Sequence, residues 1–318
     1  MSSLARFRPR QAAFRHEALL YAGDEEFLAG TVPFIRDGLE GGEPVLVVVD
    51  SAKIAGLRAE LGAGAGDVRF ADMQEVGANP ARIIPAWREF VNDHTDGRRP
   101  LRGIGEPISA GRSAAELVEC QRHESLLNLA FADAGPFRLL CPYDTASLDA
   151  AVIEEAHRSH PVVVHDGTER DSTGYEGIDA LAAPFARPLP EPPATPDEIA
   201  FDIDDLSQLR AFVARRARGA GLSEQKAKDL IVAVNEVATN SIRYSSGQGR
   251  LLAWAEGDAL VCEVRDDGEI LEPLVGRERP APGRIGGHGL WLANQLCELV
   301  QVRSFPDGSV VRLHAHRA

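Results

Sequence analysis

The stretch DLIVAVNEVATNSIRY, residues Asp229–Tyr244, decides how the second half of this 318-residue chain is interpreted. Its apolar residues recur at spacings of three and four, which predicts an amphipathic helix packed along one side. Glu236 and Asn240 stand four residues apart and therefore project from one shared face. Such a pair is common on solvated helix faces, so it indicates a site only when other motifs accompany it. The residues expected to pack on the opposite face are Leu230, Ile231, Val234, Val237 and Ala238.

Two further motifs follow this helix. The residues V-R-D-D-G, Val264–Gly268, indicate a strand that enters a turn with a carboxylate at its end, although D-G by itself is also an ordinary turn. The residues G-G-H-G-L, Gly286–Leu290, indicate glycines that open a helix, where exposed N–H groups and the helix dipole attract phosphate. By themselves these glycines could equally mark the end of a flexible loop. An irregular stretch, Glu269–Gly286, separates the two motifs.

The order of elements in this half predicts an α+β domain, with helices on one face of an antiparallel sheet. GD and PDG turns separate neighbouring apolar runs, as expected for antiparallel strands. Strands are expected at 198–203, 250–256, 260–266, 300–305 and 309–315, and helices at 206–218, 223–244 and from Leu290.

In this fixed order the three motifs resemble the nucleotide-binding domain of the GHKL ATPase superfamily, which has the Bergerat fold. The resemblance covers about residues 198–318 and implies ATP and Mg²⁺ as cofactors. It matches Glu236 to the general base, Asn240 to the magnesium ligand, and Asp266 to the carboxylate that accepts from the adenine amino group. It also matches Gly268 to the close-approach glycine, Gly287 and Gly289 with the adjacent Leu290 to the phosphate-binding turn, and 269–286 to the lid.

One position departs from the family pattern. Where many members have D-x-G-x-G, this chain has DDGEI at 266–270, so Ile270 replaces the second glycine. The start of the domain and its short lid look most like the anti-sigma-factor serine/threonine kinases. Those kinases bind a sigma factor and phosphorylate a STAS-type anti-anti-sigma protein. The alternatives are a sequestering module with a degenerate ATP site, which the missing glycine favours, and an atypical sensor histidine kinase. Residues 184–235 contain no histidine, which disfavours a histidine kinase of the usual arrangement, so this last alternative would act on the histidine of a partner protein.

A proline-rich joint, PFARPLPEPPATP at Pro184–Pro196, predicts the domain boundary, because fixed φ angles and missing N–H donors suit an extended spacer. We expect domains at 1–183 and 198–318, with a linker at 184–197. In the first domain five apolar runs alternate with helical segments, which favours a mostly parallel α/β sheet covered on both faces. The expected strands are 45–50, 68–72, 101–106, 137–141 and 161–166, and the helices are 25–39, 52–61, 80–94, 113–131 and 145–157.

The pattern over about residues 10–165 resembles the MEDS sensory domains, a degenerate RecA-like family found in bacterial regulators. No G-x-x-x-x-G-K-[ST] phosphate loop is present, so this domain is not expected to be an ATPase. No His or Cys spacing in it predicts a metal site. In such α/β domains ligands bind at the strand ends and beside polar helix faces. Single histidines at these places are nevertheless more often ordinary core or surface residues. The candidate sensory residues are His16, Tyr21, Glu106, His123 and Tyr143.

Composition narrows the function further. The formal net charge of −14 disfavours direct binding to nucleic acid or to an anionic membrane. No apolar run approaches a membrane span or a signal peptide, which predicts a cytoplasmic protein. The four scattered cysteines favour reduced structural thiols. The two family resemblances together imply a bacterial regulator that controls transcription through protein partners, and the kinase resemblance also implies a homodimer.

Overall fold

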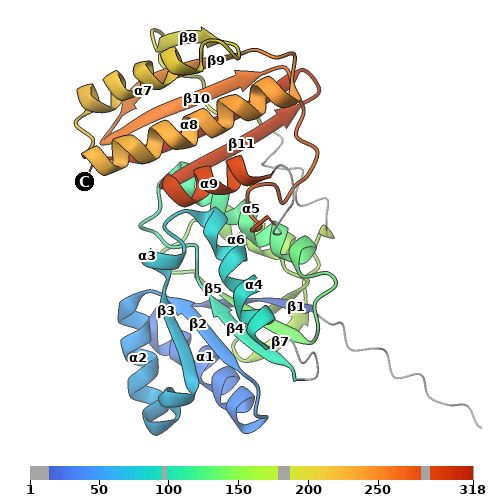
Figure 1. Cartoon of the computed structure of the whole chain (residues 1–318). Coiled ribbons are helices and arrows are strands. Elements are labelled where there is room, and N and C mark those ends of the chain that lie inside the picture. Colours follow the sequence, from blue (N-terminus) through green and yellow to red (C-terminus); the bar gives the residue numbers. More distant parts are fainter. Residues whose placement is uncertain (1–13, 95–98, 178–186, 281–286, 318) are drawn as a thin grey trace, which may run out of the picture. The chain divides into compact units, whose positions relative to one another are not determined.

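The computed structural model describes residues 14–94, 99–177, 187–280 and 287–317, which pack as two compact units (Figure 1). The first unit comprises Met1–Gln74, Glu89–Gly111 and Leu127–Ala180. The second comprises Glu75–Arg88, Arg112–Leu126 and Leu181–Ala318. The second unit therefore draws two short segments from the first half of the chain.

The first unit is built on a seven-stranded sheet in the order β3-β2-β4-β5-β1-β6-β7. Every neighbouring pair is parallel except β6 and β7. This confirms the predicted mostly parallel α/β fold. The strands are β1 (Phe14–Tyr21), β2 (Val45–Val49), β3 (Val68–Asp72), β4 (Leu101–Gly105), β5 (Phe137–Asp144), β6 (Val162–His165) and β7 (Thr168–Asp171). The α-helices among these strands are α1 (Gly23–Glu40), α2 (Ser51–Leu61), α3 (Met73–Val76), α4 (Ile83–Asp93), α5 (Ala114–Ala130) and α6 (Ala150–Ser159), and the 3₁₀ helices are η1 (Gly62–Asp67) and η2 (Pro80–Arg82).

Strand β1 lies inside this sheet, between β5 and β6, although its apolar pattern did not predict it. Two buried polar residues, His16 and Glu17, interrupt the run of apolar side chains. Arg138 of β5 compensates the Glu17 charge with two hydrogen bonds of 2.9 Å. Side chains alternate along the strand. Tyr21 packs in the apolar cluster that includes Phe27 of α1, whereas His16 contacts α5 on the other face.

The second unit contains a five-stranded antiparallel sheet in the order β11-β12-β10-β9-β8. Its core joins apolar residues of α7 and α8 to one face of the sheet. Figure 1 shows α7 and α8 running alongside the strands. This confirms the predicted α+β sandwich. The strands are β8 (Asp197–Phe201), β9 (Gly249–Glu256), β10 (Ala259–Asp266), β11 (Leu299–Phe305) and β12 (Gly308–His316). The helices are α7 (Leu206–Ala220), α8 (Glu224–Tyr244) and α9 (His288–Leu296).

Local signals in the sequence fix the ends of the two long helices. Gly221 ends α7 in the left-handed conformation, with φ 77°, which glycine adopts without the steric cost that a side chain would add. The Ser223 side chain caps α8 by accepting from the Lys226 N–H. Along α8, the buried positions include Leu230, Val234 and Val237 at helical spacing. The helix therefore presents a fixed polar face beside its packed one.

The four cysteines are free and buried, as expected for structural thiols. Burial raises the pKa of both Cys120 and Cys262 to about 12, so these thiols stay protonated at neutral pH.

Within the described ranges, no helix is both long enough and apolar enough to span a lipid bilayer.

His314 of β12 gives the second unit a pH dependence. It is 7% exposed, and burial lowers its pKa to about 4 against the opposing charge of Glu256. In the unfolded chain His314 takes up a proton near pH 6.5, whereas in the folded chain it takes one up only near pH 4. The free energy of unfolding therefore falls as the pH drops from about 6.5 to 4. We expect about 2 kcal/mol to be lost between pH 7.5 and pH 5 through this group.

Urea unfolding followed by tryptophan fluorescence tests this, because all three tryptophans, at 87, 254 and 291, lie in the second unit. His314→Gln should unfold with a pH dependence weaker by that amount. The exposed His165 of the first unit provides the control, and His165→Gln should leave the dependence unchanged. An equal loss in His314→Gln and the parent protein would contradict the prediction.

Candidate functional site

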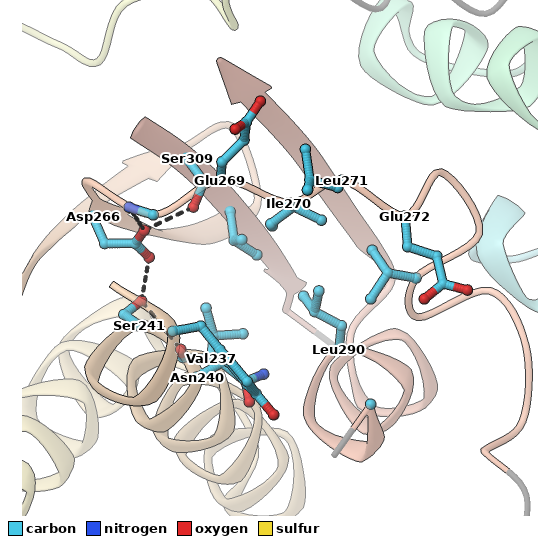
Figure 2. Close-up of a pocket in the computed structure, with 15 residues that line it drawn as sticks. Val237, Asn240, Ser241, Asp266, Glu269, Ile270, Leu271, Glu272, Leu290 and Ser309 are labelled. Atoms are coloured by element: carbon cyan, nitrogen blue, oxygen red, sulfur yellow. Dashed lines mark hydrogen bonds between the residues drawn. The ribbon is translucent and has the colours of Figure 1, made fainter. Parts of the chain in front are cut away.

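A cavity of about 450 Å³ opens in the second unit, between α8, the start of α9 and the ends of β10 and β12 (Figure 2). The segment that follows β10 forms its remaining wall. The lining residues are Val237, Asn240, Ser241, Tyr244, Asp266, Gly268, Glu269, Ile270, Leu271, Glu272, Val275, Gly287, Leu290, Ser309 and Val311.

The Asp266 carboxylate is fixed inside this cavity by three hydrogen bonds. The Ser241 hydroxyl donates to Oδ2 at 2.5 Å, and the Gly268 N–H and Ser309 hydroxyl donate to Oδ1 at 2.8 and 3.0 Å. Figure 2 shows the side chain held between α8 and the strands. Held in this way at the end of β10, Asp266 is an oriented acceptor for a ligand N–H group.

Gly268 leaves no room for a side chain beside this carboxylate. A Cβ at this position would lie 3.0 Å from the Tyr244 carbonyl oxygen and 3.1 Å from the Ser245 Cβ. The turn after β10 therefore packs directly on the C-terminal end of α8.

Gly289 of α9 packs against Asn240 in the same manner. A Cβ on Gly289 would lie 2.5 Å from the Asn240 Nδ2 and 3.3 Å from the Glu236 carbonyl oxygen. Only a residue without a side chain lets α9 start this close to α8. Asn240 lines the cavity, and Glu236 lies one helical turn earlier and is half-buried.

The rest of the wall is largely apolar. Ile270, which occupies the place of the second glycine of the family motif, lines the cavity, and its N–H donates to the Ser304 hydroxyl at 2.7 Å. Gly287, with φ 84°, caps α9 in a left-handed conformation. The predicted lid continues through 281–286, and these residues, including Gly286 of the glycine motif, lie outside the described part of the chain.

Farther along the lid, Arg277 is 4% exposed and lies in a buried charge cluster. It donates to one carboxylate oxygen of Glu119, and Arg303 donates to the other, each at 2.8 Å. Glu119 lies on α5, within the segment that belongs to this unit. Burial lowers the pKa of Arg277, and the Glu119 charge opposes that effect. Arg277 therefore anchors the segment that follows β10 to Glu119.

In the first unit, Tyr21 and Glu106 come together with Lys53, which sequence reasoning missed. The Tyr21 hydroxyl donates to Glu106 Oε1 at 2.5 Å, and Lys53 donates to Oε2 at 2.6 Å. Glu106 is 5% exposed, and burial raises its pKa although Lys53 pulls in the opposite direction. The group lies at the carboxyl ends of β1 and β4, where ligands of parallel sheets bind.

The remaining sensory candidates lie elsewhere. The rings of Tyr143 and His160 are nearly perpendicular, with centroids 5.5 Å apart, and His16 contacts Cys141. His123 lies on α5 and belongs to the second unit. The predicted set is therefore divided, and only Tyr21 and Glu106 share a hydrogen-bonded group among the contacts described here.

Two family models match the chain. The model of the methanogen/methylotroph, DcmR sensory domain, MEDS, matches residues 15–161, and that of the histidine kinase-like ATPase domain matches residues 199–315. The chain carries a MEDS domain followed by a histidine kinase-like ATPase domain. This confirms both resemblances found in the sequence.

Solved structures match part of the chain at low identity. The RsbU and RsbW domains of Rv1364c from Mycobacterium tuberculosis are 20% identical, with a TM-score of 0.30, over 39% of this chain and 33% of that one. The histidine kinase AdeS from Acinetobacter baumannii is 13% identical, with a TM-score of 0.22, over 38% of this chain and 68% of that one. This chain thus spans about a third of the Rv1364c structure. No curated protein matches significantly.

The ATPase domain brings most of its predicted residues around one cavity. Asn240, Asp266, Gly268, Gly287 and Leu290 line it, while Gly289 and Glu236 adjoin it. Sequence reasoning missed the two serines that hold Asp266. Their only signals are that Ser241 follows Asn240 and that Ser309 follows the PDG turn.

Gly289→Ala should weaken Mg-ATP binding by the ATPase domain about tenfold or more, because the new Cβ would displace the Asn240 amide. Isothermal titration of the full-length protein with Mg-ATP measures this. Gly219→Ala on α7 is the matched control, since its Cβ would contact no other residue within 4 Å. Equal affinities for the two variants would show that the close approach does not position Asn240 for binding.

Proposed function

We propose that this protein is a cytoplasmic bacterial regulator whose ATPase domain binds Mg-ATP and acts as an anti-sigma factor with serine/threonine kinase activity. It would phosphorylate a STAS-type anti-anti-sigma protein and bind a sigma factor. The MEDS domain would control both activities. The domain limits we propose are 1–183 and 198–318, joined by the linker 184–197, of which 184–186 lie outside the described residues. The oriented Asp266 acceptor in an apolar-walled cavity carries this proposal.

Adenine fits the chemistry of this cavity. Val237, Ile270, Leu290 and Val311 offer apolar contact to a flat ring, and Asp266 offers a charged acceptor to its exocyclic amino group. Because three donors already fix the carboxylate, little orientational freedom is lost when the base binds. The cavity therefore supports recognition of an amino-substituted purine.

The phosphates would lie toward Asn240 and the start of α9. Gly287 opens that helix, whose first N–H groups favour an anion. The Asn240 side-chain oxygen is the kind of hard donor that Mg²⁺ accepts beside phosphate oxygens. Bound Mg²⁺ would neutralise charge on the transferred phosphoryl group.

Glu236 is the residue we propose as general base. It precedes Asn240 by one turn of α8, so it shares that face of the helix, and it is half-buried. Its carboxylate would accept the proton of the attacking Ser or Thr hydroxyl. Asn240 would position the metal-bound phosphates, so the two residues have separable roles.

A serine or threonine substrate is supported by the sequence before the domain. A histidine kinase of the usual arrangement carries its phosphoacceptor histidine just ahead of the ATPase domain, and 184–235 contain no histidine. The net charge of −14 favours regulation through protein partners over direct contact with nucleic acid.

Ile270 favours a second candidate, a sequestering module that transfers no phosphate. Its side chain occupies cavity wall where many relatives have glycine, and its N–H is already bonded to Ser304. A nucleotide that binds poorly here would leave the protein a binding module alone.

Three substitutions test the division of roles, using labelled ATP and a STAS-type antagonist. Glu236→Gln should lower phosphoryl transfer about 10²–10⁴-fold while Mg-ATP binding stays nearly unchanged. Asn240→Ala should weaken Mg-ATP binding itself about tenfold or more. Asp266→Asn should cost about 1–3 kcal/mol of binding through a mispaired adenine amino group. The protein label should be acid-stable.

Asp266→Asn should keep its fold, because the new amide can donate to Ser241, whose hydroxyl also reaches the Val237 carbonyl oxygen at 3.3 Å. Asp267→Asn is the matched control, since that neighbouring carboxylate is exposed and accepts from the Ser246 N–H. Full transfer by Glu236→Gln would refute the general-base role. Acid-labile label would indicate a histidine kinase, and sigma-factor binding without any ATP response would indicate the sequestering module.

A further inference from the structure

Three buried side chains of metal-binding types meet inside the MEDS domain. His16 of β1 and Cys141 of β5 are each 1% exposed, and His160, directly after α6, is fully buried. Their ligand atoms lie within 4.8 Å of one another. The His16 Nε2 lies 3.3 Å from the Cys141 Sγ, and the two imidazole centroids are 3.9 Å apart.

Strand register explains how residues so distant in sequence meet. β1 and β5 are parallel neighbours, with Ala18 opposite Cys141 and His16 opposite Leu139. Alternating side chains put His16 and Cys141 on the same face of the sheet. Tyr21, five positions after His16, points to the opposite face with its Glu106 partner. The His16 cluster is therefore separate from the Tyr21 group and from the ATPase cavity.

Hydrogen bonds around His16 fix which ring nitrogen carries its lone pair. The Asn128 Nδ2 donates to the Ser159 carbonyl oxygen at 2.7 Å, so the Asn128 Oδ1 faces His16. That oxygen lies 3.2 Å from the His16 Nδ1 and can only accept, so Nδ1 carries the hydrogen. In the neutral ring the lone pair is then on Nε2, the atom directed at Cys141.

His160 is oriented in the same sense. Its Nδ1 lies 2.9 Å from the Ala156 carbonyl oxygen, which can only accept, and 3.0 Å from the Ser159 hydroxyl, which donates to the Glu155 carbonyl oxygen. This nitrogen therefore also carries the hydrogen. The lone pair of the neutral ring is therefore on Nε2. Partners of this kind on the remote nitrogen are what orient histidines that bind a metal. Both imidazoles present Nε2 as their ligand atom.

We propose that His16 Nε2, Cys141 Sγ and His160 Nε2 form a transition-metal site of the zinc class in the MEDS domain. Two imidazoles and one thiolate suit Zn²⁺ or Co²⁺, whereas Mg²⁺ and Ca²⁺ prefer oxygen ligands. Zn–N and Zn–S bonds of about 2.0 and 2.3 Å in a tetrahedron separate N from S by about 3.5 Å. The 3.3 Å between His16 and Cys141 is close to that spacing.

Binding converts a thiol into a thiolate and changes no oxidation state. The Cys141 proton leaves to solvent as the S–metal bond forms. Without metal, the Cys141 S–H can donate to the His16 Nε2 at the observed 3.3 Å. The Cys141 thiol thus has a hydrogen-bond acceptor in the metal-free state. The proposal does not depend on the function of the ATPase domain.

Titration of chelator-treated full-length protein with Co²⁺ tests the site. We expect one Co²⁺ per chain, visible d–d absorption typical of a tetrahedral ion, and a near-ultraviolet thiolate-to-cobalt charge-transfer band. Cys141→Ala should abolish that band and His160→Gln should weaken binding at least tenfold. Cys262→Ala is the matched control, since Cys262 is also a free buried cysteine, and its spectrum should equal that of the parent protein.

Asn128→Leu separates a positioning role from a purely structural one. Because Asn128 orients His16 without touching the metal, this variant should keep the charge-transfer band and lose about 10–100-fold in Co²⁺ affinity. Zn²⁺ should displace Co²⁺ and erase both spectra. Absence of stoichiometric Co²⁺ binding, or a charge-transfer band that survives in Cys141→Ala, overturns the proposal. Circular dichroism checks folding, and His160→Gln serves if Cys141→Ala does not fold.

Discussion

The packing of α8 on the antiparallel sheet is the constraint on which the ATPase cavity depends. Leu230, Val234 and Val237 share a core with strand residues of the sheet. Because the helix has 3.6 residues per turn, burying that stripe sets the direction of every other side chain on it. Asn240 then lies against Gly289 at the start of α9, and Glu236 stands one turn earlier on the same side of α8. The site geometry follows from where the helix buries its apolar side.

Most of the fold could be predicted from the sequence, since nearly every apolar run of suitable length forms the helix or strand that was expected there. It failed at β1, where His16 and Glu17 break the apolar pattern of a central strand. Their burial depends on partners from β5 and α5 that no local pattern reveals. It also placed the start of α6 about one turn early, because the Asp144 side chain accepts from the Ala146 N–H and the Ser147 hydroxyl and holds a turn there.

The candidate sites differ in the same way: residues in short local motifs could be predicted from the sequence, and residues brought together by tertiary contacts could not. Residues of the ATPase cavity come from short motifs in which the chemistry and the turn lie side by side, as in the DDG that follows β10. Lys53, Ser309 and the pairing of Cys141 with His160 come from strand register and helix docking across long separations. Local periodicity carries no information on such pairs, because register depends on the whole sheet.

The Glu119 cluster affects how the protein can be divided. One carboxylate serves two buried guanidinium groups, Arg277 and Arg303, and it comes from a helix more than 60 residues ahead of the proline-rich joint. A fragment that starts at the joint would retain both arginines and lose their common counterion. Cutting the chain there removes the helix that carries the counterion of both arginines. The linker that separates the two halves in sequence is thus not the edge of a self-sufficient folding unit, and the lid would be the first part of such a fragment to loosen.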